Sequence, residues 1–209
     1  MLFRSAVATF GTESGSLAPD ATGRWSVAAR LGPLTVVGIW SCPSDGSYAT
    51  EVRRAVDAHV RWLDPAADVI VAGDFNVAGR TPGRSTAGAT AALFRYLADL
   101  GLSSAYHTVR DERFGVESAA TYYHHRDRGR PFHIDFCFVS RSLRDRLETV
   151  EVGDYDTWIG TGHSDHAPIV VDFADRGDDR DRETRAGGVT RPVASASSPR
   201  PDGTSRQIG

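Results

Sequence analysis

The chain has 209 residues, of which 40% are hydrophobic, and this is enough to build one domain with a buried core. Its net charge of −3 and pI near 6.1 argue against a strongly basic nucleic-acid-binding protein, although a local patch could still hold phosphates. All 24 basic residues are Arg, which is better explained by coding bias than by function.

The sequence also excludes a membrane protein and a disulfide scaffold. No apolar run is long enough to span a membrane, and the N-terminus lacks the charged start and apolar core of a signal peptide. Cys42 and Cys137 are far apart in sequence and lie in apolar surroundings. We therefore expect a reduced, cytoplasmic protein without a membrane partner.

The N-terminal region predicts three strands, at 2–10, 24–30 and 34–40. The Gly/Ser/Pro-rich stretch at 12–23 is interpreted as a turn, and Gly32-Pro33 predicts a tight reversal that makes the last two strands a hairpin. An amphipathic helix is expected at 48–63. Its apolar stripe would consist of Val52, Val56, Val60 and Leu63.

A short apolar run at 68–76 ends in Gly73-Asp-Phe-Asn76 and predicts a strand that is buried on both faces. Polar groups at its end need partners, because burying Asp74 and Asn76 unpaired would cost about 2 kcal/mol each. Residues two apart on an extended chain point the same way, so both side chains can reach one target. A turn after a strand uses the same residue types, and the motif alone does not decide between the two interpretations.

Two segments follow that could contact a substrate. The loop at 79–85 contains arginines that could reach a phosphate or simply be solvated, and a helix at 89–100 is expected to end at Gly101. A strand at 119–125 then leads into a charged hairpin loop at 126–130. The candidate phosphate-binding residues there are His124, Arg126, Arg128 and Arg130, although such a charge run is also typical of a solvated turn. A zinc site is disfavoured because no cysteine or third spaced ligand joins the histidines.

The apolar strand at 133–140 contains one carboxylate, Asp135. Its alternation places Ile134, Phe136 and Phe138 on one face and His133, Asp135, Cys137 and Val139 on the other. A carboxylate in so apolar a strand needs a partner, and His166 is available. A short helix is expected at 142–147, a strand at 149–152, and a further strand that opens near Pro168 and ends near Phe173.

Residues 174–209 are rich in Gly, Ser, Pro and Arg and contain almost no large apolar residue. They cannot bury enough surface to offset the entropy of ordering, and we expect a disordered tail. The folded domain is accordingly expected at 1–173.

Three motifs in order resemble those of the endonuclease/exonuclease/phosphatase superfamily. They are Gly73-Asp-Phe-Asn76, His133-Ile-Asp-Phe136 and Ser164-Asp-His-Ala-Pro168, and the resemblance covers about residues 1–173. It implies the deoxyribonuclease-I-like fold, a four-layer α/β sandwich of two face-to-face mixed sheets flanked by helices. The irregular alternation of strands and helices also argues against a doubly wound sheet.

The resemblance implies a metal-dependent phosphoester hydrolase, a nuclease or a phosphatase, that uses Mg²⁺ or alternatively Mn²⁺. Asp74 would orient or deprotonate the attacking water, and Asn76 would hydrogen-bond that water or a phosphate oxygen. Asp135 would hold the imidazole of His166, which would stabilise the phosphoryl group, and Asp165 would bind the metal. Nucleic acid is one candidate among several phosphoester substrates, and the oligomeric state is left open.

The sequence departs from the family pattern near its start. The family's opening elements carry an Asn and a metal-binding Glu that have no counterpart here, and Trp40 stands where many relatives have a second catalytic His. Glu13 is a poor substitute because it lies in a Gly/Ser turn. We therefore expect an N-terminally incomplete domain that binds Mg²⁺ weakly and hydrolyses little. The alternative is a non-catalytic remnant or interaction domain that keeps the fold.

Overall fold

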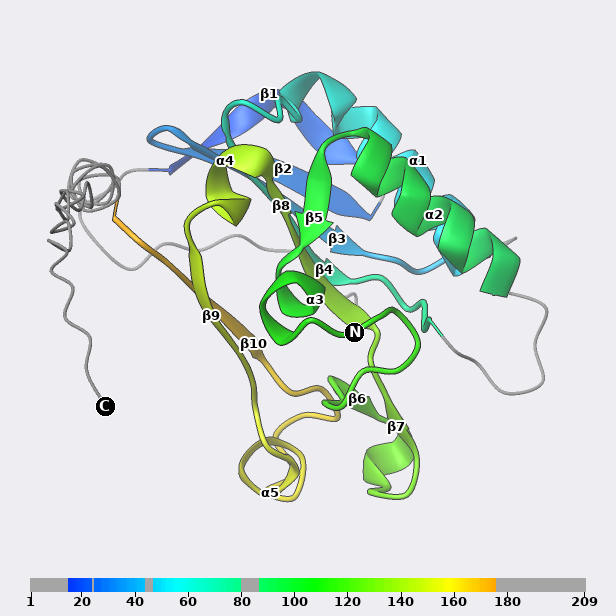
Figure 1. Cartoon of the computed structure of the whole chain (residues 1–209). Coiled ribbons are helices and arrows are strands. Elements are labelled where there is room, and N and C mark those ends of the chain that lie inside the picture. Colours follow the sequence, from blue (N-terminus) through cyan, green and yellow to red (C-terminus); the bar gives the residue numbers. More distant parts are fainter. Residues whose placement is uncertain (1–14, 24, 44–46, 80–86, 176–209) are drawn as a thin grey trace, which may run out of the picture. The chain divides into compact units, whose positions relative to one another are not determined.

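The computed structural model describes residues 15–23, 25–43, 47–79 and 87–175 (Figure 1). The predicted strand at 2–10, Glu13, the arginines of the loop at 79–85 and nearly all of the predicted tail lie outside these ranges. Within them, no helix combines the length and apolar character that a membrane crossing requires.

In the described part of the chain, the main sheet is mixed and has six strands. In spatial order they are β1 (Gly15–Gly23), β2 (Ser26–Leu31), β3 (Leu34–Trp40), β4 (Asp68–Asp74), β8 (Asp135–Ser140) and β5 (Leu102–Ser104). The predicted hairpin is confirmed as β2 and β3, and among the strands described the β3–β4 pair alone is parallel. That pair can be parallel because a helical connection carries the chain back between the two strands.

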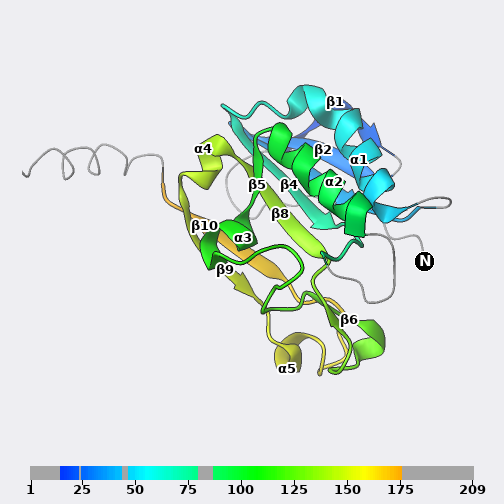
Figure 2. The same ribbon diagram turned by 45° about the vertical axis from the view of Figure 1, so that its right-hand side comes forward.

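Two helices cover one face of this sheet, α1 (Tyr48–His59) and α2 (Ala87–Asp99) (Figures 1 and 2). The α1 helix is capped at its N-terminus by Ser47, whose hydroxyl accepts a hydrogen bond from the Thr50 amide at 3.2 Å. The core beneath the helices is formed by alternate strand residues and the apolar helix faces, including Val52, Val56, Val69, Val71, Leu93, Leu97, Phe136 and Phe138.

The other face of the main sheet carries a second core. The strands β9 (Leu147–Val152) and β10 (Ile169–Phe173) pair in antiparallel fashion, and with α3 (Ala105–Arg110) they enclose Tyr106, Cys137, Val139 and Val150. Cys137 and Val139 thus face away from Phe136 and Phe138, as the alternation predicts. The other described elements include the hairpin of β6 (Tyr122–Tyr123) and β7 (Pro131–Phe132), a 3₁₀ turn at His124–Arg126, α4 (Arg141–Arg144) and α5 (Tyr155–Trp158).

Several predicted elements differ from the structure. The expected turn at 12–23 contains β1, which pairs with β2 through a register shift between Leu17 and Thr22; an edge strand tolerates such a bulge and a proline. The chain tightens into a 3₁₀ turn at Val60–Trp62, so Val60 is 46% exposed and not part of the apolar stripe. The strand expected at 119–125 shrinks to β6 because His125 and Arg126 have positive φ. The helix expected at 142–147 ends earlier, and Leu147 begins β9.

Candidate active site

The candidate site lies where β4 ends between β3 and β8. In the strand register Asp74 is opposite Trp40 on the parallel side and opposite Asp135 on the antiparallel side. Residues directly opposite each other in an antiparallel pair project to the same face. The two carboxylates from distant motifs are therefore brought together by strand pairing alone.

Gly73 permits this close pairing of β3 and β4. Its φ is +137°, and a Cβ built on it would lie 2.0 Å from the backbone oxygen of Ile39. A side chain at this position would collide with the neighbouring backbone, which cannot move aside as a flexible side chain could. Glycine is thus required by the fold of the strand end itself.

Asn76 holds the carboxylate of Asp74 in place. Its backbone is left-handed, with φ of 52°, and its amide N donates to Asp74 Oδ1 at 2.9 Å. Its side-chain Nδ2 donates to Asp74 Oδ2 at 2.8 Å and to the carbonyl of Ser41 at 3.0 Å. Both hydrogens of Nδ2 are used in these bonds, which leaves the Oδ1 acceptor of Asn76 for a water or a substrate.

Asp135 and His166 form the predicted pair. The Nδ1 of His166 lies 2.9 Å from Asp135 Oδ2 and 3.2 Å from Oδ1. An ionised carboxylate only accepts hydrogen bonds, so we assign the proton to Nδ1, which leaves Nε2 for a substrate or water. The ring of His166 packs against that of Tyr122 with 4.7 Å between centroids.

The electrostatics of the site are dominated by burial and by the two adjacent acids. Burial, together with the nearby charge of Asp135, raises the pKa of Asp74 from 3.8 to about 7, although His166 and Asn76 act in the opposite direction. Burial lowers the pKa of His166, but its hydrogen bond to Asp135 and the charges of Asp135, Asp74 and Asp165 outweigh this, so the pKa is raised above 6.5. Asp74 is thus poised to exchange a proton near neutral pH.

The carboxylate and imidazole groups that meet at this site are of the kinds that bind a divalent cation. Ligand atoms of Asp74, Asp135 and His166 all lie within 4.8 Å of one another. The Nδ1 of His166 is bonded to Asp135, so the carboxylate oxygens are the better metal donors. Asp165, the predicted metal ligand, is outside this group, but its charge lies close enough to raise the pKa of both Tyr122 and His166.

The predicted phosphate-binding residues lie on the β6–β7 hairpin, next to the loop that carries His166. Arg126 Nε donates to the Ser164 carbonyl at 3.4 Å, and His124 Nδ1 lies 2.9 Å from the Tyr122 hydroxyl. Arg128 is engaged elsewhere, because it forms an ion pair with Asp156 and stacks over the ring of Tyr155. Arg126 thus contacts the motif that contains His166, whereas the contacts described for Arg128 are with residues outside that motif.

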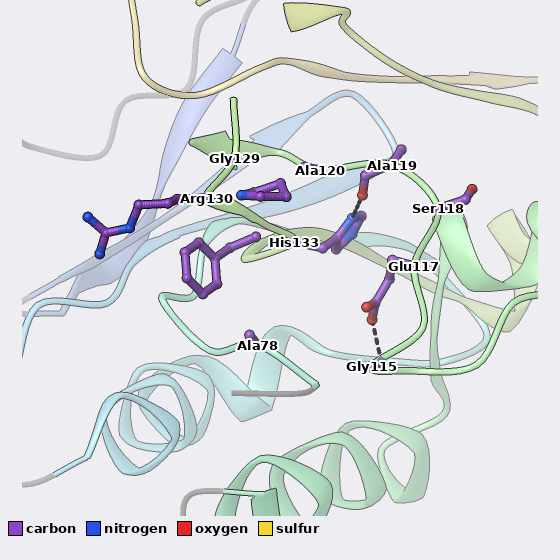
Figure 3. Close-up of a pocket in the computed structure, with 11 residues that line it drawn as sticks. Ala78, Gly115, Glu117, Ser118, Ala119, Ala120, Gly129, Arg130 and His133 are labelled. Atoms are coloured by element: carbon purple, nitrogen blue, oxygen red, sulfur yellow. Dashed lines mark hydrogen bonds between the residues drawn. The ribbon is translucent and has the colours of Figure 1, made fainter. Parts of the chain in front are cut away.

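Arg130 borders a pocket of about 480 Å³ (Figure 3). Ala78, two residues after Asn76, and His133, two residues before Asp135, also line it, so the pocket adjoins two of the motifs along the chain. His133 is bonded through Nδ1 to the carbonyl of Ala119 at 2.9 Å (Figure 3). Burial lowers the pKa of His133 below 6.5, which favours the neutral form of this lining residue.

Sequence reasoning missed two contributors to the site. The carbonyl of Ser41 accepts from Asn76, but a backbone acceptor has no signal in a sequence. Tyr122 pairs with His166 through an isolated β-bridge and packs on its ring. The sequence pattern around Tyr122 predicted a strand, but it did not predict the contact between Tyr122 and His166.

Comparison with known proteins gives matches only at the level of structure. No protein-family model matches the sequence, and no curated protein matches it. A 3′ phosphatase from Neisseria, bound to a product DNA hairpin, is 21% identical with a TM-score of 0.60, over 78% of this chain and 71% of that one.

Two further solved structures are similar. An AP endonuclease from Archaeoglobus fulgidus is 16% identical with a TM-score of 0.63, over 78% of this chain and 72% of that one. A 3′–5′ exonuclease from Neisseria meningitidis is 19% identical with a TM-score of 0.57 and the same two coverages, 78% and 72%. The chain therefore has the deoxyribonuclease-I-like fold, which confirms the fold class predicted from the three motifs.

Proposed function

We propose that this chain is a phosphoester hydrolase that works through Asp74, Asp135 and His166. The observation that carries the proposal is the meeting of these side chains within 4.8 Å, although they come from three separate sequence motifs. Two like charges that are partly buried side by side destabilise a fold, so their presence indicates a functional role. The alternative of an interaction domain gives no reason for this arrangement.

Asp74 is the general base in this proposal. Its pKa of about 7 lets it accept the proton of a water molecule near neutral pH. The water oxygen forms a bond to phosphorus, the bond from phosphorus to the ester oxygen breaks, and the leaving oxygen is protonated by solvent. Asn76 keeps the Asp74 carboxylate in one orientation and offers Oδ1 to the same water.

His166 stabilises the phosphoryl group. Its raised pKa favours the imidazolium form, and the Asp135 hydrogen bond leaves Nε2 as the donor that faces the phosphoryl oxygens. Asp135 acts through His166, by fixing the ring and balancing its charge.

A divalent cation would be held by Asp165, near the negative charge of the Asp74–Asp135 pair, and Asp74 would remain free to accept the proton. Mg²⁺, or alternatively Mn²⁺, would polarise the phosphoryl oxygens and offset their developing charge. A bound cation would also relieve the repulsion between the two acids. We infer metal dependence from this donor chemistry.

We propose nucleic acid, and DNA first, as the substrate. The support is that two of the similar structures are an AP endonuclease and a phosphatase bound to a DNA hairpin, together with Arg126 beside the His166 loop and Arg130 at the pocket. Arg126 would contact a phosphate, and Arg130 and His124 would extend that contact.

The test uses three fluorescent DNA duplexes: intact, with a 3′-phosphate, and with an abasic site. Arg126→Ala should raise KM for the preferred duplex about tenfold and weaken its salt dependence, since one phosphate contact is lost. Arg144→Ala is the matched control, because Arg144 is exposed on α4 and pairs with Asp145. Equal KM values for Arg126→Ala and wild type would contradict the assigned substrate surface.

A further inference from the structure

Thr121 connects the two segments that carry Asp135 and His166. It is 0% exposed and immediately precedes β6. Its hydroxyl oxygen accepts two backbone hydrogen bonds, from the amides of Ile134 and Asp135, both at 3.0 Å. One side-chain atom thus binds two consecutive amides at the start of β8.

The backbone of Thr121 makes further connections to both sides. Its carbonyl accepts from the amide of Ala167 at 2.8 Å, and its amide donates to the carbonyl of Phe132 at 2.9 Å. The peptide group that joins His166 to Ala167 is therefore bonded to the same residue as the peptide group that joins Ile134 to Asp135. The next residue, Tyr122, continues the contact through its β-bridge to His166.

These bonds act on the torsions that aim the two catalytic side chains. The hydrogen bond to the amide of Asp135 limits rotation of the backbone at Asp135, and so limits the direction of its Cα–Cβ bond. The hydrogen bond to the peptide after His166 limits rotation of the backbone at His166. The Asp135–His166 hydrogen bond joins side chains 31 residues apart, so small shifts of either backbone would lengthen it. A displacement of about 1 Å at a catalytic group can lower a rate about a hundredfold.

We propose that Thr121 is a positioning residue that sets the geometry of the Asp135–His166 pair. Its hydroxyl oxygen holds the strand of Asp135, and its carbonyl holds the loop of His166. The structural half of this inference is independent of the proposed function, while its effect on turnover rests on that function.

The hydroxyl can be removed with little change of shape. Thr121→Val keeps the volume but leaves the amides of Ile134 and Asp135 without an acceptor, whereas Thr121→Ser keeps the oxygen. Ser140→Ala is the matched control, because Ser140 is also buried on β8 and its hydroxyl accepts the Val69 amide at 3.1 Å, at the opposite end of the strand. The Ser140→Ala variant therefore loses the same kind of hydrogen bond, but at the end of β8 that is far from His166.

The first readout is the tautomer of His166 at alkaline pH, from long-range proton–nitrogen spectra of protein with labelled histidine, assigned with His166→Gln. Wild type, Thr121→Ser and Ser140→Ala should keep the proton on Nδ1, as the bond to Asp135 requires. Thr121→Val should show the Nδ1 form reduced by at least half. If Thr121→Val does not fold, Thr121→Cys, whose sulfur is a weaker acceptor, takes its place.

The second readout is steady-state hydrolysis of a phosphodiester with a divalent metal. Thr121→Val should lower kcat about 10- to 100-fold and leave KM within about twofold, because it disturbs orientation and not substrate contacts. Thr121→Ser should restore kcat, and Ser140→Ala should lower stability without lowering kcat.

Two results would overturn the inference: an unchanged His166 tautomer in folded Thr121→Val, or loss of the Nδ1 form in Thr121→Ser. An inactive wild-type chain would refute the proposed function alone, since the tautomer measurement needs no turnover.

Discussion

Asp74 and Asp135 stand directly opposite each other on the antiparallel strands β4 and β8. Like charges in this position repel each other, and burial prevents water from screening them. Burial, and after it the charge of Asp135, raises the pKa of Asp74 to about 7. Either a proton on Asp74 or a cation bound nearby relieves this repulsion, so cation binding should lower the pKa of Asp74.

The metal-free protein should be stabilised by Asp74→Asn at alkaline pH. The pKa of Asp74 is raised by folding from 3.8 to about 7, so ionisation destabilises the folded state progressively as pH rises between these values. The full effect is about 4 kcal/mol, and part of it is offset because Asn loses one hydrogen bond to Asn76. We expect the variant to be about 2–3 kcal/mol more stable than wild type at pH 8.

Urea denaturation in the presence of a chelator measures this difference. The gain in free energy of unfolding should shrink steadily from pH 8 to pH 5, because Asp74 becomes protonated in the folded wild type. A variant less stable than wild type at pH 8 would show that the Asp74 charge is satisfied by its neighbours.

Asp135→Asn should lose nearly as much activity as His166→Ala. An amide at 135 can donate to Nδ1 and so favours the wrong tautomer of the His166 ring. Each variant should lower kcat/KM about 10²- to 10⁴-fold, and the double variant should lose little more. Asp145→Asn, at an exposed position beside Arg144, serves as the control. Wild-type kcat/KM in Asp135→Asn would assign Asp135 a purely structural role.

The sequence predicted the elements whose pattern is local. The alternation around Asp135 follows from the two-residue period of a strand, and both faces of β8 pack as expected. The meeting of Asp135 and His166 was also expected, because a carboxylate in an apolar strand needs a partner.

The features that were not predicted depend on pairing between distant segments. The Asp74–Asp135 opposition requires the register of β4 against β8, and β1 forms through a bulge that a Gly/Ser/Pro-rich stretch does not signal. Val60 fits the spacing of the apolar residues of α1, but it lies in a 3₁₀ turn, and residue spacing alone does not predict where an α-helix changes to a 3₁₀ turn. Thr121 acts through bonds to backbone amides, which have no sequence signature.

Gly73→Ala should strongly destabilise the domain. The new Cβ would lie 2.0 Å from the Ile39 oxygen, and alanine would also have to adopt a φ of +137°. We expect a loss of at least about 3 kcal/mol in the free energy of unfolding, since the obstacle is backbone. Gly88→Ala is the matched control: Gly88 is on α2 with nothing within 4 Å of its added Cβ, and alanine there should stabilise by about 0.5–1 kcal/mol. A similar melting temperature for both variants would contradict the packing of β3 against β4.

His59 should make the domain sensitive to mild acid. The side chain is 0% exposed, with Nε2 2.9 Å from the Ser26 hydroxyl, and burial together with the charge of Arg61 lowers its pKa below 6.5. The unfolded chain therefore takes up this proton first, and the stabilising contribution, complete above pH 6.5, is lost as pH falls below that value.

The expected loss is up to about 1.4 kcal/mol per pH unit. Urea titrations at pH 7.5 and 5 should show a smaller loss for His59→Gln than for wild type, while His163→Gln, at an exposed position, should behave as wild type. Equal pH dependence of wild type and His59→Gln would mean that buried His59 does not titrate in this range.

In the proposed reaction, His166 and its partners hydrolyse a phosphoester with a divalent metal. This is measured as hydrolysis of a bis-aryl phosphate, with Mg²⁺ or Mn²⁺ and with a chelator, for wild type, His166→Ala and His163→Ala. His163 lies in the same loop, is exposed and bonds only to the Thr161 hydroxyl among the contacts described for it, so it controls for loop damage. We predict slow, metal-dependent turnover that falls at least about 100-fold in His166→Ala and persists in His163→Ala. Absence of metal-dependent turnover in wild type, or equal turnover in His166→Ala, would contradict the proposed reaction.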